Sequence, residues 1–119
     1  MHDRDFSKDE FDAKWMALRA RFIARLPERM AEIGIHWAAC ANGDPRDALK
    51  TLFHITHSLA GSGATFGFDQ LSRAAREAET SIESAMTSGP PLDGVALART
   101  ADALRQLTDV AASFTGSRP

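Results

Sequence analysis

One histidine in this chain of 119 residues has a setting that could support chemistry. His57 lies within a helical pattern, and glycines follow it at positions 61, 63 and 67. A glycine inside a helix costs about 1 kcal/mol relative to alanine, so Gly61 suggests a reason beyond helix stability. Gly61 comes one turn after His57 on the same helical face. We therefore expect the imidazole edge to be open to a bulky group, such as the active site of another protein.

An accessible imidazole is a nucleophile near neutral pH, because its unperturbed pKa is about 6.5. It can attack phosphorus and later release the phosphoryl group, and such transfers depend mainly on positioning and charge stabilisation. The sequence contains neither a glycine-rich nucleotide lid nor a Gly-Lys-Ser/Thr stretch of the Walker type. We therefore expect no complete ATP-dependent kinase.

Metal binding is the main alternative use of these histidines. His54 and His57 are three residues apart and could form one edge of a metal site. No third ligand is clustered with them, and Cys40 belongs to a different predicted helix. We expect no metal site, and we interpret His54 as a neighbouring surface residue that tunes the surface or contacts a partner.

The composition limits the class of protein. The net charge of −2 gives no basic excess for nucleic acid, and no apolar run approaches the roughly 20 residues of a membrane span. The N-terminus shows no signal-peptide pattern, and a single cysteine excludes an internal disulfide. We expect one cytoplasmic domain over residues 1–119, with an ordered core at about 7–114 and no membrane or nucleic-acid partner.

The predicted elements are helical throughout. Valine is rare, tyrosine is absent, alanine is abundant, and no alternating run indicates a strand. Breaks at Pro27, Asn42-Gly43, Gly67 and the stretch 88–91 divide the chain into five helices. The prediction is an all-α fold: an antiparallel up-down-up-down four-helix bundle from the last four, with an additional N-terminal helix across one end.

Local patterns refine these boundaries. Ser7 and Glu10 form a capping box, and Asp44 and Asp69 are candidate caps for the third and fourth helices. The first helix carries one apolar stripe, made of Phe11, Trp15, Leu18, Phe22 and Leu26. Of these, we expect Phe11, Trp15 and Phe22 to be core. The third helix has a broad face that should be buried, made of Leu49, Leu52, Phe53, Thr56, Leu59, Ala60 and Gly63.

His57 falls on the edge of that face and should be partly exposed. The segment from this histidine resembles the phosphohistidine motif of histidine-containing phosphotransfer (HPt) domains in bacterial and plant phosphorelays. The residues that fit are His57, Leu59, Gly61, Ser62, Phe66 and Gly67, whereas Ala60 stands where the family usually has lysine. The four-helix bundle is also the fold that this resemblance implies.

The resemblance implies a phosphorelay role. His57 would accept a phosphoryl group on Nε2 from a receiver domain or hybrid histidine kinase and pass it to a response-regulator aspartate. The receiver would supply the aspartate, a lysine and Mg²⁺, so the chain would need no cofactor of its own. Gly61 would leave steric room, and three cationic residues could replace the missing lysine: Lys50, Arg73 and Arg76.

Two further expectations concern partners. Exposed apolar residues near the histidine form the docking surface in HPt domains, and Phe11, Met16 and Ile23 are the candidates here. The alternative function is a non-catalytic bundle that binds or inhibits signalling proteins after losing transfer. No long coiled-coil seam is present, so we expect a monomer.

Overall fold

The computed structural model describes residues 2–90 and 92–115, with side chains described for residues 8–90 and 92–114. Within these residues the chain forms five helices and no strand, which confirms the all-α prediction. The last residues of the chain, 116–119, lie outside the described residues. The helices are α1 (His2–Ala24), α2 (Leu26–Ala39), α3 (Arg46–Thr65), α4 (Asp69–Ser88) and α5 (Gly94–Thr115).

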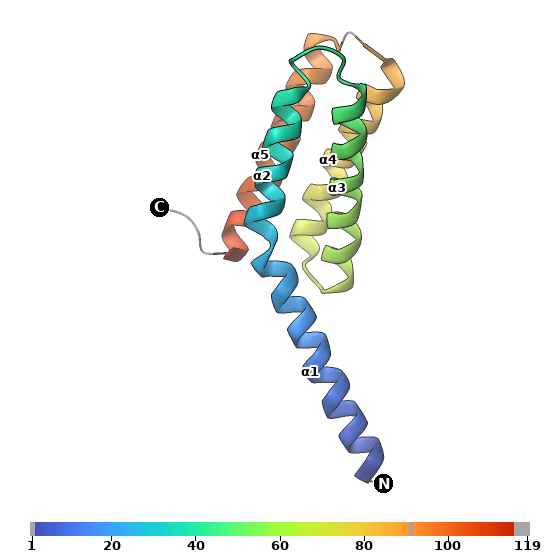
Figure 1. Cartoon of the computed structure of the whole chain (residues 1–119), viewed down its shortest axis with the longest axis vertical. Coiled ribbons are helices and arrows are strands. Elements are labelled where there is room, and N and C mark those ends of the chain that lie inside the picture. Colours follow the sequence, from blue (N-terminus) through green and yellow to red (C-terminus); the bar gives the residue numbers. More distant parts are fainter. Residues whose placement is uncertain (1, 91, 116–119) are drawn as a thin grey trace.

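The last four helices form the predicted antiparallel bundle (Figure 1). α3 packs against α2 and α4, and α5 closes the bundle by packing against α4 and α2. Short connections join consecutive helices, so neighbours in sequence are also neighbours in space. The core runs along the bundle axis, and each bundle helix contributes fully or almost fully buried side chains, among them Leu26, Ile33, Leu52, Leu71, Ile82 and Leu107.

The α3–α4 turn is a Schellman motif, and it fixes how these two helices face each other. The amide of Phe68 donates to the carbonyl of Gly63 (2.7 Å), and the amide of Gly67 donates to that of Ala64 (3.1 Å). Gly67 has a φ of +83°, a left-handed conformation that glycine adopts without steric cost. The sequence prediction of a reversal at Gly67 is therefore confirmed.

α1 joins α2 almost without interruption. Arg25 separates the two helices, and Pro27 lies in the first turn of α2, where its missing amide hydrogen breaks no helical hydrogen bond. The amide of Arg25 still donates to the carbonyl of Arg21 (3.1 Å), and that of Arg29 donates to Arg25 (3.0 Å). Leu26, between them, is fully buried and anchors the junction to the core.

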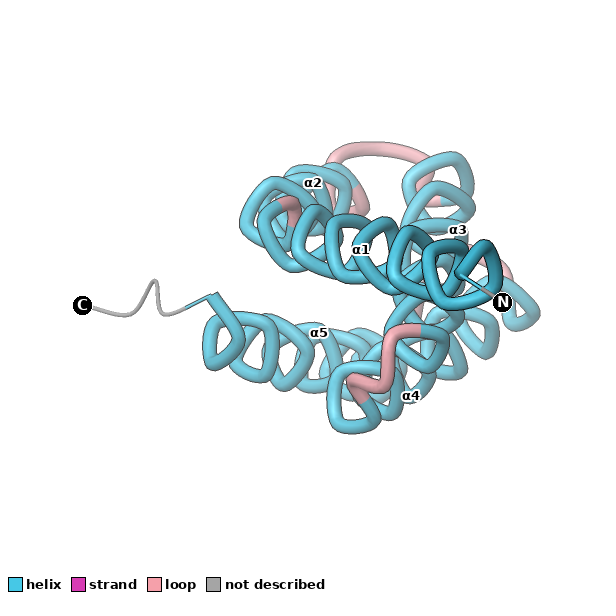
Figure 2. Tube along the Cα trace, turned by 90° about the horizontal axis from the view of Figure 1, so that it is seen from below, coloured by secondary structure: helices cyan, strands magenta, loops and turns pink. Residues whose placement is uncertain are grey.

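Among the described side chains of α1, those that pack on the bundle lie from Trp15 onward. Trp15 and Phe22 contact Phe66 in the α3–α4 turn, with ring centroids 5.0 and 5.6 Å apart. The Arg19 Nε donates to the Phe66 carbonyl (3.2 Å), and its guanidinium lies 4.3 Å from the ring centroid of Phe68. α1 therefore passes across the end of the bundle beside this turn (Figure 2) and continues beyond it (Figure 1).

The prediction that Phe11 is a core residue is wrong, whereas Trp15 and Phe22 are half-buried. Phe11 is 64% exposed and stacks on Trp15 of its own helix, because α1 extends past the bundle there, and Leu18 is exposed at the edge of a surface groove. Met16, a docking candidate, is exposed, whereas Ile23 is half-buried against the core. A 3.6-residue period identifies an apolar face but not whether anything covers it.

Two expected helix caps are also wrong, and one is shifted. α1 begins at His2, so Ser7 lies inside the helix and cannot cap it. α4 begins at Asp69 with Phe68 at the cap position and no capping side chain. Asp44 does accept a hydrogen bond from the Arg46 amide (3.0 Å), but Pro45 holds the formal cap position and α3 begins one residue later than expected.

Candidate functional site

His57 projects into solvent from the middle of α3. Its side chain is 69% exposed, whereas Thr56 beside it is fully buried and donates to the Leu52 carbonyl (2.9 Å). The predicted buried face of α3 is confirmed at Leu49, Leu52, Thr56, Leu59, Ala60 and Gly63, and Phe53 is half-buried. His57 therefore stands at the edge of a rigid, well-packed helix.

Glu79 of α4 fixes the orientation and tautomer of this imidazole. The His57 Nδ1 lies 2.7 Å from the Glu79 Oε2, and the Glu79 side chain is only 17% exposed. An ionised carboxylate can only accept a hydrogen bond, so Nδ1 is the donor. The neutral ring then carries its free electron pair on Nε2, which points away from α4 and is the nitrogen available to an incoming group.

An aromatic ring supports the imidazole from the other side. Phe53 lies one turn earlier on α3, and its ring stacks on His57 with centroids 5.9 Å apart and an interplanar angle of 13°. Together with the Glu79 hydrogen bond, this contact restricts both ring rotation and ring tilt. The histidine is thus exposed at its Nε2 edge and held on two other sides.

The two nearby glycines of α3 have different surroundings. A Cβ at Gly61 would meet nothing within 4 Å, so the space next to His57 is open, as the sequence predicted. A Cβ at Gly63 would lie 3.2 Å from the Ser72 backbone nitrogen of α4. Gly63 therefore serves close helix packing, and the nearby Ser72 hydroxyl donates to the Ala60 carbonyl (2.7 Å).

The position where the family usually carries lysine is buried here. Ala60 is 2% exposed and faces the α3–α4 interface. Because these helices are antiparallel and His57 faces Glu79, moving three residues along each brings Arg76 level with position 60. Arg76 is exposed and lies about 60° around α4 from Glu79, since successive residues are about 100° apart.

The other two predicted cations are less well placed. Arg73 is exposed but lies two turns from Glu79 and about 120° around α4. Lys50 is exposed on nearly the same face of α3 as His57, but seven residues correspond to about 10 Å along the helix axis. Of the three, Arg76 is the cation that the register brings nearest to the imidazole.

His54 does not extend the site toward a metal. It is exposed, and its ring meets the edge of Phe53 with centroids 5.9 Å apart. Among the described residues, no group of three or more histidine, cysteine, aspartate or glutamate side chains is arranged to hold a metal ion. His54 therefore lies on the same exposed surface of α3 as His57, and its role at that surface stays a prediction.

Sequence reasoning did not single out Glu79. A signal for it does exist. His57 precedes Phe68 in the turn by eleven residues, and Glu79 follows Phe68 by eleven, so an antiparallel hairpin of helices brings them level. That count requires knowing the centre of the turn, which the Schellman motif reveals only in three dimensions.

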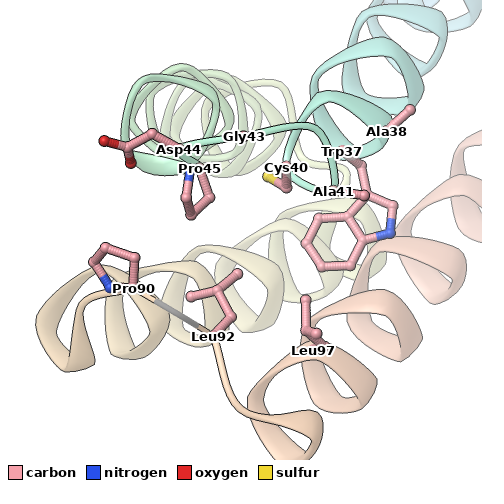
Figure 3. Close-up of a pocket in the computed structure, with 10 residues that line it drawn as sticks. All are labelled: Trp37, Ala38, Cys40, Ala41, Gly43, Asp44, Pro45, Pro90, Leu92 and Leu97. Carbon is pink, nitrogen blue, oxygen red and sulfur yellow. The ribbon is translucent and has the colours of Figure 1, made fainter.

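A cavity of about 650 Å³ lies at the end of the bundle opposite the α3–α4 turn (Figure 3). Trp37 and Cys40 line it from α2, Pro45 from the start of α3, and Leu97 from α5. Burial raises the pKa of the Cys40 thiol and so favours its uncharged form. Pro45 precedes His57 by twelve residues, or roughly 18 Å of helix, so this cavity is not part of the histidine site.

The fold and the site define a class of protein: a helical bundle that presents one oriented, solvent-exposed histidine from the middle of a helix. The family model of the Hpt domain matches residues 17–113, and the chain belongs to this family. No curated protein and no solved structure matches the chain. The match confirms the resemblance that the sequence around His57 indicated.

Membership places the protein in the phosphotransfer family of phosphorelays, whose members interact with receiver domains. The matched range begins within α1 and ends within α5, so it includes all of α2, α3 and α4. Among the described residues, no helix combines the length and the apolar character needed to cross a membrane.

Proposed function

We propose that this protein is a phosphocarrier that accepts a phosphoryl group on Nε2 of His57 and passes it to a response-regulator aspartate. One observation supports this above all others: the Glu79 carboxylate holds Nδ1 as the donor and leaves Nε2 both nucleophilic and exposed. A histidine serving only as a polar surface residue needs neither a partly buried carboxylate on its inner nitrogen nor an open space beside it.

In the proposed step, the Nε2 electron pair attacks phosphorus while the bond from phosphorus to the donor's aspartyl oxygen breaks. No proton has to leave Nε2 first, because in this tautomer the proton is on Nδ1. The imidazole gains positive charge as the N–P bond forms, and the Glu79 carboxylate 2.7 Å away stabilises it. The reverse step returns the phosphoryl group to an aspartate.

The remaining machinery would come from the partner. The receiver domain would supply the aspartate, a lysine and Mg²⁺, while this chain would supply a positioned nucleophile and a docking surface. Gly61 leaves the approach to His57 open, and the exposed Phe11 and Met16 remain candidates for apolar contact with the partner. We further propose that the protein acts as a cytoplasmic monomer.

The first test needs no partner protein. Purified protein is treated with phosphoramidate, a small phosphodonor, and the modified residue is located by mass spectrometry. Wild type is compared with His57→Gln and with His54→Gln, a matched control three residues away. We expect acid-labile phosphate on His57, abolished by the first substitution and retained with the second.

Transfer is then tested by mixing phosphorylated protein with a panel of receiver domains. Movement of the phosphate to a receiver aspartate supports the carrier role. Phosphate spread evenly over the histidines, or absent from His57, would contradict it. The buried Ala60 keeps one alternative open, a binding or inhibitory module, for which receiver domains would bind His57→Gln as tightly as wild type and no phosphate would move.

A further inference from the structure

A second feature of the surface lies across α3 from the imidazole. A groove of about 220 Å³ runs between the α1–α2 junction and α3, and its lining includes the apolar side chains of Phe22 and Phe66. Ser58 and Ser62 of α3 form part of its wall, and Ser58 is the residue directly after His57. The groove therefore borders the candidate site without containing it.

Three arginines line this groove on the side of the junction. Arg21, Arg25 and Arg29 are four residues apart, and backbone hydrogen bonds from Arg25 to Arg21 and from Arg29 to Arg25 keep the helical register through the break. Residues four apart on a helix share a face. The interruption before Pro27 thus leaves the three guanidinium groups on one side of the α1–α2 arm.

These charges are available to a partner. Among the described residues Arg21 forms no ion pair, while Arg25 pairs loosely with Glu28 at 3.7 Å and Arg29 with Glu32 at 3.2 Å. The Arg25–Glu28 pair is exposed and contributes only about 0–1 kcal/mol, so it exchanges readily for a better one, whereas the Arg29–Glu32 pair is half-buried. A chain with a net charge of −2 therefore concentrates positive charge beside its candidate site.

The groove lies within the area that a docked partner must cover. A standard protein interface takes about 800 Å² from each partner, equivalent to a disc of about 16 Å radius. One helix diameter, about 10 Å, separates the two sides of α3. A domain that docks over His57 and over Ser58, about 100° further around α3, therefore reaches the near wall of the groove.

We infer that this groove, defined by Arg21, Arg25 and Arg29, receives an acidic surface element of the partner receiver domain. This inference rests on the proposed function, because it takes its partner from the exchange at His57. Guanidinium groups bind carboxylates in a forked geometry and are weakly hydrated, which suits an interface. The apolar lining around Phe22 and Phe66 favours a protein surface over a free anion, and the small size of the patch in an acidic chain disfavours nucleic acid.

The test uses a receiver domain that exchanges phosphate with His57 in the assay above. Its association rate is measured for wild type, for Arg21→Glu with Arg25→Glu, and for Arg99→Glu with Arg105→Glu on α5. Both double variants change the net charge by −4, since each replacement changes it by −2. We expect the groove variant to associate about tenfold more slowly at low ionic strength and the α5 variant to change little.

Salt gives a second readout. Wild-type association should slow as ionic strength rises, and the groove variant should lose most of this dependence. Equal slowing in both double variants would show that net charge alone matters and would overturn the inference. So would normal association of the groove variant, or saturable binding of inorganic phosphate to the groove with receiver association unchanged.

Phosphoramidate labelling of His57 distinguishes a failure of the phosphocarrier function from a failure of receiver docking at the groove. If the groove variant is labelled normally but binds the receiver poorly, the inference stands on an intact site. If wild type is not labelled on His57 and transfers no phosphate, the proposed function fails first. Should the glutamates disturb folding, Arg21→Gln with Arg25→Gln decides the matter, and an unchanged association rate would then overturn the inference.

Discussion

The two faces of α3 each carry a glycine, and the two glycines have different roles. Gly61 opens the solvent face beside His57, whereas Gly63 lets α4 approach the buried face to van der Waals distance. The same contrast holds for neighbouring residues, since His57 is exposed and Thr56 is sealed in the core. A rotation of about 100° around the helix axis therefore separates Thr56, in the packed core, from His57, the accessible nucleophile.

The largest expected difference between the two faces arises when the same charge is placed on each. Ala60→Lys restores the residue usual in the family, but at a position 2% exposed. We expect it to lower the free energy of unfolding by about 2–4 kcal/mol, because a buried ammonium lacks a partner. Gly61→Lys is the matched control and should raise stability by about 0.5–1 kcal/mol through helix propensity. Equal midpoints in urea denaturation would show that the faces do not differ in this way.

The next effect concerns the hydrogen bond that orients the solvent face. Glu79→Ala should slow phosphoramidate labelling of His57 about tenfold, since a hydrogen bond to a charged group is worth about 1.5–3 kcal/mol. Without the carboxylate, the ring also populates the tautomer that is protonated on Nε2. Glu79→Gln keeps an acceptor oxygen but loses the negative charge, so its rate should fall between those of wild type and Glu79→Ala. If both variants are equally slow, charge rather than tautomer is the contribution of Glu79.

A smaller and purely structural effect sharpens the contrast between the glycines. Gly63→Ala should lower the free energy of unfolding by about 1–2 kcal/mol, because its Cβ would press on the α4 backbone at 3.2 Å. Gly61→Ala should instead raise it by about 0.5–1 kcal/mol. Thermal and urea unfolding of both variants measure this difference. A destabilised Gly61→Ala would contradict the open space beside His57.

The smallest expected effect concerns the cations on the solvent face. Arg76→Ala should slow transfer between His57 and a receiver domain by about two- to fivefold, which matches the 0.2–1 kcal/mol of an exposed charge pair. Arg73→Ala is the control on the same helix and should leave the rate unchanged, with Lys50→Ala between them. If none of the three substitutions alters the rate, the charge-stabilising role is wrong for all of them.

Much of this molecule follows from its sequence. Apolar periodicity and the breaks at Pro27, Gly43, Gly67 and Gly89 predicted five helices and their antiparallel order, because these signals are local. The angular position of His57 around the third helix correctly placed it at the edge of a buried face. The motif around it was sufficient to identify the family that the family model confirms.

The errors arise where the outcome depends on distant contacts. Phe11 has the pattern of a core residue, but α1 extends past the bundle end and leaves it exposed. Glu79 looked like one of several surface charges, and only the register between α3 and α4 shows that it meets His57. Burial and pairing at these positions are set by the packed structure.

Because α1 is attached to the bundle only in part, its backbone hydrogen bonds should open faster than those of the bundle. Its contacts with the bundle begin at Trp15, and residues 8–14 are all exposed. An unsupported stretch of helix in water is only marginally stable, whereas amides near Leu52 are released only when the whole bundle unfolds. Hydrogen exchange should therefore divide the chain into a fast-exchanging arm and a slow-exchanging bundle. The arm can melt and re-form many times during the life of one folded molecule, without disturbing the histidine that the bundle carries.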